Sequence, residues 1–208
     1  MDTAFLITAF VTLFVVIDPI GMTPLFVALT QGMGAARRRA IALRACVTSA
    51  LLLIVFAAFG EAVLEFIGIS MPAFRIAGGV LLFLTALDML FERRTKRRKD
   101  QADEAEDDDG DDPSVFPLAI PLIAGPGAIA SVILLVGQRP GPEGLAMVIG
   151  VMLSLVLLVF LMFLTGSILE RALGRVGINV VTRLLGMLLA ALAVQFVLDG
   201  LRGFGLAG

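Results

Sequence analysis

The chain contains no histidine, tryptophan or tyrosine, and its only cysteine is Cys46. A single cysteine excludes an intramolecular disulfide and any site built from several thiolates. The absence of histidine removes the commonest general base and metal ligand. We therefore expect no catalytic residues, no metal site and no cofactor.

Charge is also scarce, because 16% of the 208 residues are charged whereas 59% are hydrophobic and the mean hydropathy is +1.00. A soluble domain is typically about 45–50% apolar and about 25% charged. The net charge of -2 sums a basic run and an acidic run, so it says little about partners. The composition predicts an all-α polytopic membrane protein that contacts membrane lipid and not nucleic acid.

The hydrophobic residues form six long segments. A bilayer core about 30 Å thick needs about 20 apolar residues per helix. The predicted spans are 3–30, 40–59, 71–91, 114–136, 145–169 and 180–201, of which the first and the fourth are interrupted by Pro and Gly. The stretches between them carry charge, Gly or Pro, and we expect "ERALGRVGI", between the last two spans, to be a loop.

Positive charge is concentrated on one side of the predicted membrane. Basic residues follow the first, third and fifth spans, at Arg37, Arg38 and Arg39, in the first part of segment 92–113, and at Arg171 and Arg175. The loops of the opposite side contain only Arg139 and Arg202. Since Lys and Arg mark cytoplasmic loops, we expect both termini to lie outside and segment 92–113 to lie in the cytoplasm.

Segment 92–113, "ERRTKRRKDQADEAEDDDGDDP", divides the chain into residues 1–91 and 114–208, with three spans each. A run of this kind is most often a solvated linker. Its basic half, next to a helix end, also suits anionic lipid head groups.

The two halves resemble each other. Pro19 and Pro24 recur as Pro121 and Pro126 at an offset of 102 residues, and the pair Arg75 and Gly78 recurs as Arg183 and Gly186 at an offset of 108. Because three spans is an odd number, the second copy must be inverted in the membrane. We therefore predict two inverted three-helix repeats, with chance recurrence in a Gly-rich membrane chain as the alternative.

The two interrupted spans contain the residues best suited to bind a substrate. Proline removes a backbone donor, and inside a bilayer the freed carbonyls are tolerated only within protein or along a wet cavity. Thr23 and Pro24 suit the cap and first position of a half-helix, as do Gly125 and Pro126. Such half-helices direct unpaired N–H groups at an anionic substrate group. The predicted substrate site comprises Asp18, Pro19, Gly21, Thr23, Pro24, Pro121, Gly125, Pro126 and Gly127.

Three charged residues inside the spans have two interpretations each. Asp18 is the only carboxylate far from either end of its span. It could bind a substrate ammonium, a coupling proton or a cation, or accept backbone hydrogen bonds in an Asx-type turn. Arg75 and Arg183, about a turn inside their spans, suit ion pairing or head-group contact, with gating as the alternative.

Four stretches together resemble a known family. The segments "FVVIDPIGMTPLF", "FRIAGGVLLFLTALDML", "PLAIPLIAGPGAI" and "RLLGMLLA" are similar to the MarC family of bacterial and archaeal inner-membrane proteins, along essentially the whole chain. The proline and glycine motifs in matching halves make the resemblance fairly specific. It implies six spans and a transporter of small solutes, usually assigned as small neutral amino acids.

These observations favour a secondary transporter or exporter of a small zwitterion by alternating access, driven by a proton or sodium gradient because no nucleotide-binding loop is present. A passive channel is the alternative. An intramembrane enzyme is less favoured because Asp88, in "LTALDML", lacks the glycines of a Gly-x-Gly-Asp site. Whether the protein forms a homo-oligomer stays open.

Overall fold

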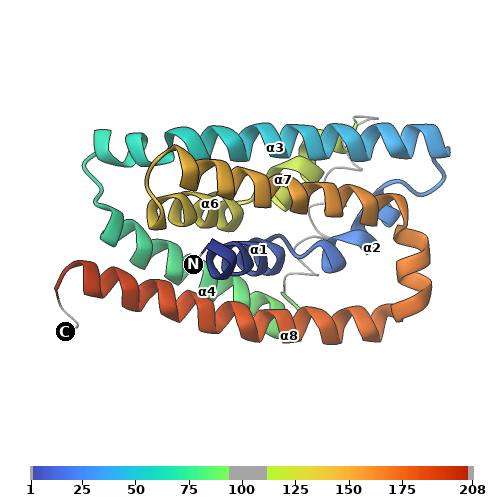
Figure 1. Ribbon diagram of the computed structural model, residues 1–208. Coiled ribbons are helices and arrows are strands. Elements are labelled where there is room, and N and C mark those ends of the chain that lie inside the picture. Colours follow the sequence, from blue (N-terminus) through green and yellow to red (C-terminus); the bar gives the residue numbers. More distant parts are fainter. Residues whose placement is uncertain (1, 94–111, 206–208) are drawn as a thin grey trace.

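The computed structural model describes residues 2–93 and 112–205, and within these ranges every element is helical. The elements are α1 (Asp2–Ile17), α2 (Pro19–Leu29), α3 (Ala35–Phe66), α4 (Met71–Leu90), η1 (Ser114–Ile123), α6 (Pro126–Gln138), α7 (Pro142–Leu164) and α8 (Gly166–Gly203). They form one helical bundle (Figure 1). The predicted all-α polytopic fold is confirmed. Most of the predicted linker, residues 94–111, lies outside the described residues.

The expected number of spans agrees with the helices. In the described ranges, five helical stretches are long and apolar enough to cross a membrane, and α1 with α2 counts as one of them, Thr3–Leu29. The number rises to six when η1 and α6, which are bent by 52°, are taken together as one broken span. The two interrupted spans are those in which the sequence places the proline pairs.

Several predicted boundaries were wrong, among them the end of the fifth span, expected at Leu169, whereas α7 ends at Leu164. The second span, expected over 40–59, is part of the 32-residue helix α3. The stretch "ERALGRVGI", expected to be a loop, is helical within α8, and the helix is kinked at Gly174, where φ is 60° and ψ is 173°. Glycine adopts a positive φ without steric cost, so one residue turns the chain where the sequence pattern suggested a longer connection.

The bundle has two distinct ends (Figure 1). The turns at 67–70 and 139–141 and the end of α8 lie together at one end. The turn at 31–34 and the corner between α7 and α8 lie at the other. Helices α4 and α8 run antiparallel, since Gly203 packs against Pro72 and Gly186 packs against Met89. This arrangement is compatible with inverted halves, and the inverted repeat itself stays a prediction.

Helices α4 and α8 make the most extensive helix–helix contact. Glycines allow their backbones to approach closely. A Cβ at Gly79 would lie 2.7 Å from the carbonyl oxygen of Ala193, and one at Gly200 would lie 2.8 Å from that of Pro72. Small residues at such contacts are typical of membrane helices, whose association depends on close van der Waals packing.

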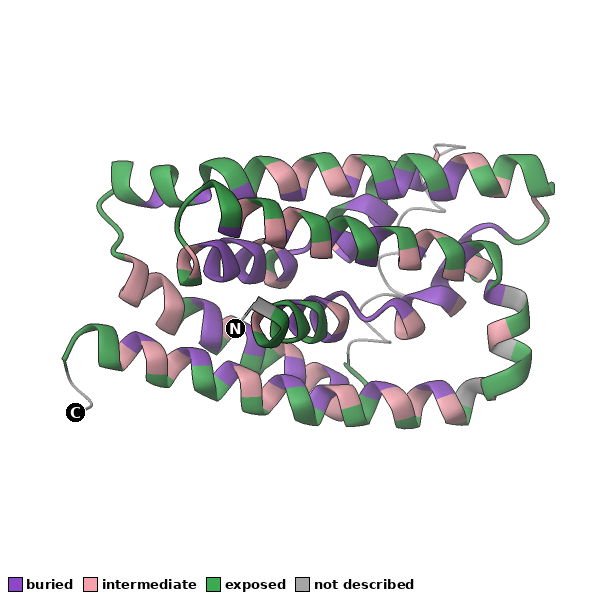
Figure 2. Ribbon diagram, viewed as in Figure 1, coloured by how far each residue is buried: buried purple, intermediate pink, exposed green. Residues whose placement is uncertain are grey.

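Burial separates the outer helix faces from the centre (Figure 2). Large apolar side chains on the outside of α3 and α8 are exposed, such as Phe59 and Met187, 61% and 60% exposed. Lipid tails solvate such faces in a bilayer. By contrast, α6 and the connection between α1 and α2 are largely buried, and so are Asp18 and Gly125 at the two breaks, whereas Pro126 is exposed.

We predict that Gly79→Ala destabilises the protein by about 1–3 kcal/mol, because the added methyl group overlaps the backbone of α8. The matched control is Gly150→Ala in α7, where an added Cβ meets no atom within 4 Å and the higher helix propensity of Ala should leave stability equal or slightly higher. Thermal unfolding of both variants in detergent measures the difference. Equal melting temperatures would contradict the close contact between α4 and α8.

Candidate functional site

The first broken span turns at Asp18. This residue has φ 57° and ψ 64°, in the left-handed region, and it is the N-cap of α2, with Pro19 in the first turn. The Asp18 carboxylate accepts a hydrogen bond from the backbone N–H of Gly21 at 3.0 Å. The Asx-type turn, one of the two interpretations of Asp18, is therefore present. It does not exclude the other interpretation, because the whole residue is buried.

Backbone hydrogen bonds continue through this break. The N–H of Asp18 donates to the carbonyl of Phe14 at 2.9 Å, and the N–H of Met22 donates to the carbonyl of Asp18 at 3.1 Å. Pro19 has no N–H to donate to the carbonyl of Val15, four residues earlier. The break thus leaves few backbone groups without a helical partner, as a buried break in a membrane requires.

Glycine is required three residues after Asp18. A Cβ at Gly21 would overlap the carboxylate of Asp18. The cap therefore depends on an aspartate and a glycine together, and the sequence shows both.

The predicted start of the second half-helix was wrong in the first half of the chain. Thr23 and Pro24 were expected to begin it, but α2 begins five residues earlier, and Pro24 lies inside the helix. The Thr23 hydroxyl donates to the carbonyl of Pro19 at 2.8 Å within the same helix. Asp18 is the stronger cap because its side chain accepts from an N–H of the first turn.

The second broken span has the expected start. Gly125 is the N-cap of α6 and Pro126 occupies its first turn, with no side-chain cap. A Cβ at Gly125 would overlap the carbonyl oxygen of Pro121. Before it, η1 contains extended residues at Phe116 and Ile120, each preceding a proline, as expected for residues before proline.

The two breaks meet in the interior. A Cβ at Gly127, in the first turn of α6, would lie 3.3 Å from Cγ1 of Val16, in the last turn of α1. It would also lie 3.5 Å from Leu82 and 3.9 Å from the hydroxyl of Thr85, both in α4. These three neighbours were missed by the sequence analysis, because each is one apolar or small residue among many in a membrane span.

Opposite helix ends lie side by side at this contact. The C-terminal end of α1 carries a partial negative charge, and the carbonyl of Val15 in its last turn has no helical N–H to accept from, because Pro19 has none. The N-terminal end of α6 presents N–H groups and carries a partial positive charge. The N–H groups of Gly127 and Ala128 are in the uncapped first turn of α6. The contact between Val16 and Gly127 therefore joins a negative and a positive backbone end.

Thr23, in α2, faces α8 and not the contact between Val16 and Gly127. A Cβ at Gly166, at the start of α8, would lie 2.9 Å from Cγ2 of Thr23. Thr23 therefore packs against α8. Of the predicted site, the structure brings the Asp18 break and the Gly127 end together.

The two arginines are partnered. Nη2 of Arg75 donates to the carbonyl of Gly137, near the C-terminal end of α6, at 3.1 Å. Nη2 of Arg183 pairs with Oε1 of Glu92 at 2.7 Å. Arg183 thus forms an ion pair, as one of its two interpretations expected. Arg75 instead donates to a backbone carbonyl at a helix end. A gating role of either stays a prediction.

The end of the linker is fixed to α3. Asp112 pairs with Arg44 and accepts from the backbone N–H of Ser114 at 3.1 Å. Desolvation by burial raises the pKa of Asp112, but the hydrogen bonds from Ser114 and the neighbouring Arg44 lower this pKa more, so that it lies below its usual range. The start of η1 is thereby held at the surface of α3.

A metal site has no support in the described ranges, which contain no group of three or more His, Cys, Asp or Glu side chains suited to a metal ion.

The fold and the two joined breaks define a class: a multi-pass integral membrane protein with two discontinuous spans. The model of the MarC family integral membrane protein matches residues 3–204. This chain belongs to the MarC family. The resemblance seen in the sequence motifs is confirmed.

Relatives in distant bacteria match over almost their whole length. The UPF0056 membrane protein of Aquifex aeolicus is 38% identical, covering 94% of this chain and 92% of the relative. YvbG of Bacillus subtilis is 37% identical, covering 98% and 97%. The inner membrane protein YhgN of Escherichia coli is 35% identical, covering 95% and 96%. No solved structure matches the chain.

The cap at Asp18 generates a stability prediction. Asp18→Ala removes both the side-chain cap and a residue type that tolerates a positive φ, and we expect it to cost about 1–3 kcal/mol. Asp18→Asn keeps the size, the acceptor and the tolerance, and we expect it to retain most of the stability. Thermal unfolding in detergent compares the two, and a loss for Asn as large as that for Ala would show that the charge, and not the cap, stabilises the break.

Proposed function

We propose that the protein is a secondary transporter or exporter of small zwitterionic solutes, with neutral amino acids as the class that fits best, and that it works by alternating access at the broken spans. The observation that carries the proposal is the contact between Val16 and Gly127. It places a carbonyl-bearing helix end beside an N–H-bearing helix end inside a membrane protein.

A zwitterion matches these two ends. Its carboxylate can accept hydrogen bonds from the uncapped N–H groups at the start of α6, as anions do at helix N-termini. Its ammonium group can donate to the carbonyl of Val15 at the end of α1, which Pro19 deprives of its helical donor, and lies there beside Asp18. Discontinuous helices that face each other in this way are a recurrent solution for substrate binding in transporters. The solute must be small, because the two ends are in contact.

Asp18 has two roles in this proposal. Its carboxylate caps α2 through Gly21, and its negative charge next to the α1 end favours an ammonium group or a coupling cation. An ionisable group buried within a span is a functional candidate by default. The coupling ion is a proton or sodium.

We propose that this conformation is closed toward the end of the bundle that carries Arg38. Asp18 and Gly125 are buried. Further along α2, the rings of Phe26 and Phe163 are stacked with centroids 4.3 Å apart and an angle of 2° between them. The guanidinium of Arg38 lies 5.8 Å from the Phe26 ring centre. In this proposal, separation of the stack opens the protein toward the end of the bundle that carries Arg38, as alternating access requires.

Transport by purified protein in lipid vesicles tests the proposal. We expect uptake of small neutral amino acids that saturates and shows counterflow, which a passive channel does not. Asp18→Asn should lose most transport while keeping near-normal stability. Gly127→Val, which fills the contact with Val16, should abolish transport, whereas the control Gly150→Val on an open helix face should not. Uptake without saturation or counterflow would favour the channel.

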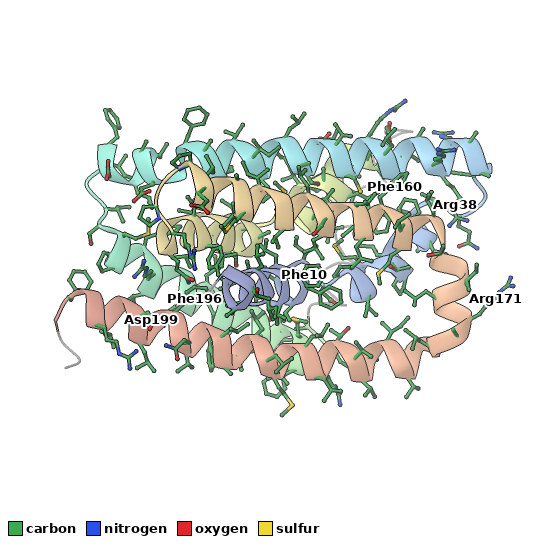
Figure 3. All side chains as sticks on the ribbon, viewed as in Figure 1. Phe10, Arg38, Phe160, Arg171, Phe196 and Asp199 are labelled. Atoms are coloured by element: carbon green, nitrogen blue, oxygen red, sulfur yellow. The ribbon has the colours of Figure 1, made fainter. Side chains whose placement is uncertain are left out.

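Orientation in the membrane supplies a second test. Arg38 and Arg171 lie at the same end of the bundle, and Asp199 lies at the other (Figure 3). We propose that the end with Arg38 and Arg171 is cytoplasmic, in accordance with the positive-inside rule.

In a Cys46→Ser background, a cysteine at position 105 should be labelled only from the cytoplasm by a membrane-impermeant thiol reagent. Cysteines at Thr3 and Phe204 should be labelled from outside. Labelling of Phe204→Cys from the cytoplasm would contradict the six-span topology. With both termini outside and the linker inside, each half crosses the membrane three times. The two halves would then have opposite orientations in the membrane.

A further inference from the structure

Three buried hydroxyl groups have no hydrogen-bond partner among the described residues, and two of them lie in α1 and α6. Thr12 in α1 and Ser131 in α6 are both 0% exposed, and neither hydroxyl is bonded within the described part of the chain. Other buried hydroxyls behave differently, since those of Thr30 and Ser49 donate to the carbonyl four residues earlier in their own helix. A buried polar group without a partner is costly and calls for an explanation.

The register of α1 and α6 places these hydroxyls opposite each other. Val16 meets Gly127, as described above, and the guanidinium of Arg139 lies 5.2 Å from the ring centre of Phe5. The two helices therefore run antiparallel. Thr12 precedes Val16 by four residues and Ser131 follows Gly127 by four. Residues four apart share a helix face, so both hydroxyls lie on the faces that meet and at the same level.

The hydroxyl pair lies one helical turn from the two backbone ends. Four residues correspond to about 6 Å along a helix. An O–H···O hydrogen bond from a hydroxyl to the solute takes up about 2.7 Å of this distance. The remainder fits a solute side chain two or three bonds long, if the carboxylate and ammonium groups of the solute are held at the helix ends. The pair carries no charge, and each hydroxyl can both donate and accept. It therefore suits a neutral hydrogen-bonding group.

We propose that Thr12 and Ser131 form a subsite for the side chain of the transported solute and select a hydroxyl or amide group over an aliphatic one. This inference rests on the proposed transport of small zwitterions, with the carboxylate at α6 and the ammonium at α1. The solute side chain enters between α1 and α6 when the contact at Gly127 opens. A water molecule offers the same chemistry, but it would not distinguish one solute from another.

L-serine and L-alanine test the subsite because they differ by one hydroxyl. The experiment measures half-saturating concentrations for counterflow of each solute in vesicles that contain the purified protein. We expect wild type to favour serine. Thr12→Val and Ser131→Ala should each raise the value for serine about 3- to 10-fold, as the loss of one neutral hydrogen bond implies, and leave the value for alanine within about twofold.

Thr182 provides the matched control. It lies in α8, is 8% exposed, and its hydroxyl also has no partner among the described residues. Thr182→Val should change neither solute. Thr12→Ser keeps the hydroxyl and should retain the preference for serine. If Thr12→Val does not fold, Ser131→Ala, which removes a single oxygen atom, decides the question.

Two outcomes overturn the subsite alone. Equal changes for serine and alanine would assign the hydroxyls to a bound water molecule or to packing, and unchanged values for both would assign them no role in binding. In either case transport by wild type still supports the proposed function. If wild type transports neither solute, nor any other small neutral amino acid, the proposed function fails and the subsite fails with it.

Discussion

A backbone N–H or C=O group inside a bilayer has no water to bond to, and the two broken spans depend on this constraint. A break is tolerated only where protein surrounds it and supplies partners. At the first break, the Asp18 side chain supplies an acceptor and the helix hydrogen bonds continue around it. At the second, Gly125 allows the chain to pass close to the carbonyl of Pro121. Burial in the centre of the bundle is a condition of both breaks.

Bringing the breaks together gives the interior its polarity. If the last turn of α1 and the first turn of α6 ended against lipid, their polar backbone groups would have no hydrogen-bond partners. In contact, they form a pair of opposite partial charges in a medium of low dielectric constant, where such charges act strongly. Fixed backbone groups at helix ends require no ionisable side chains, which agrees with a chain without histidine and with one carboxylate deep in a span.

The antiparallel pair of α4 and α8 forms a frame beside this centre. Its glycines bring the two backbones close, and Leu82 and Thr85 of α4 contact the position of Gly127. Helix α4 therefore contacts both α8 and the first turn of α6. Arg75 and Arg183 lie at matching places in these two helices. Arg75 donates a hydrogen bond to the end of α6, and Arg183 forms an ion pair with Glu92.

Sequence by itself determined the membrane class, the six apolar segments and the two breaks, because hydrophobicity, proline and glycine act locally. It also determined the cap at Gly125. It did not determine that α2 begins at Asp18 in place of Thr23, because both residues are good caps and only the fold selects the positive φ of Asp18. The neighbours Val16, Thr85, Thr12 and Ser131 were decided by tertiary structure alone. Their roles depend on the register between helices that are about 40 to 120 residues apart in the chain, and that register results from side-chain packing, which no local pattern records.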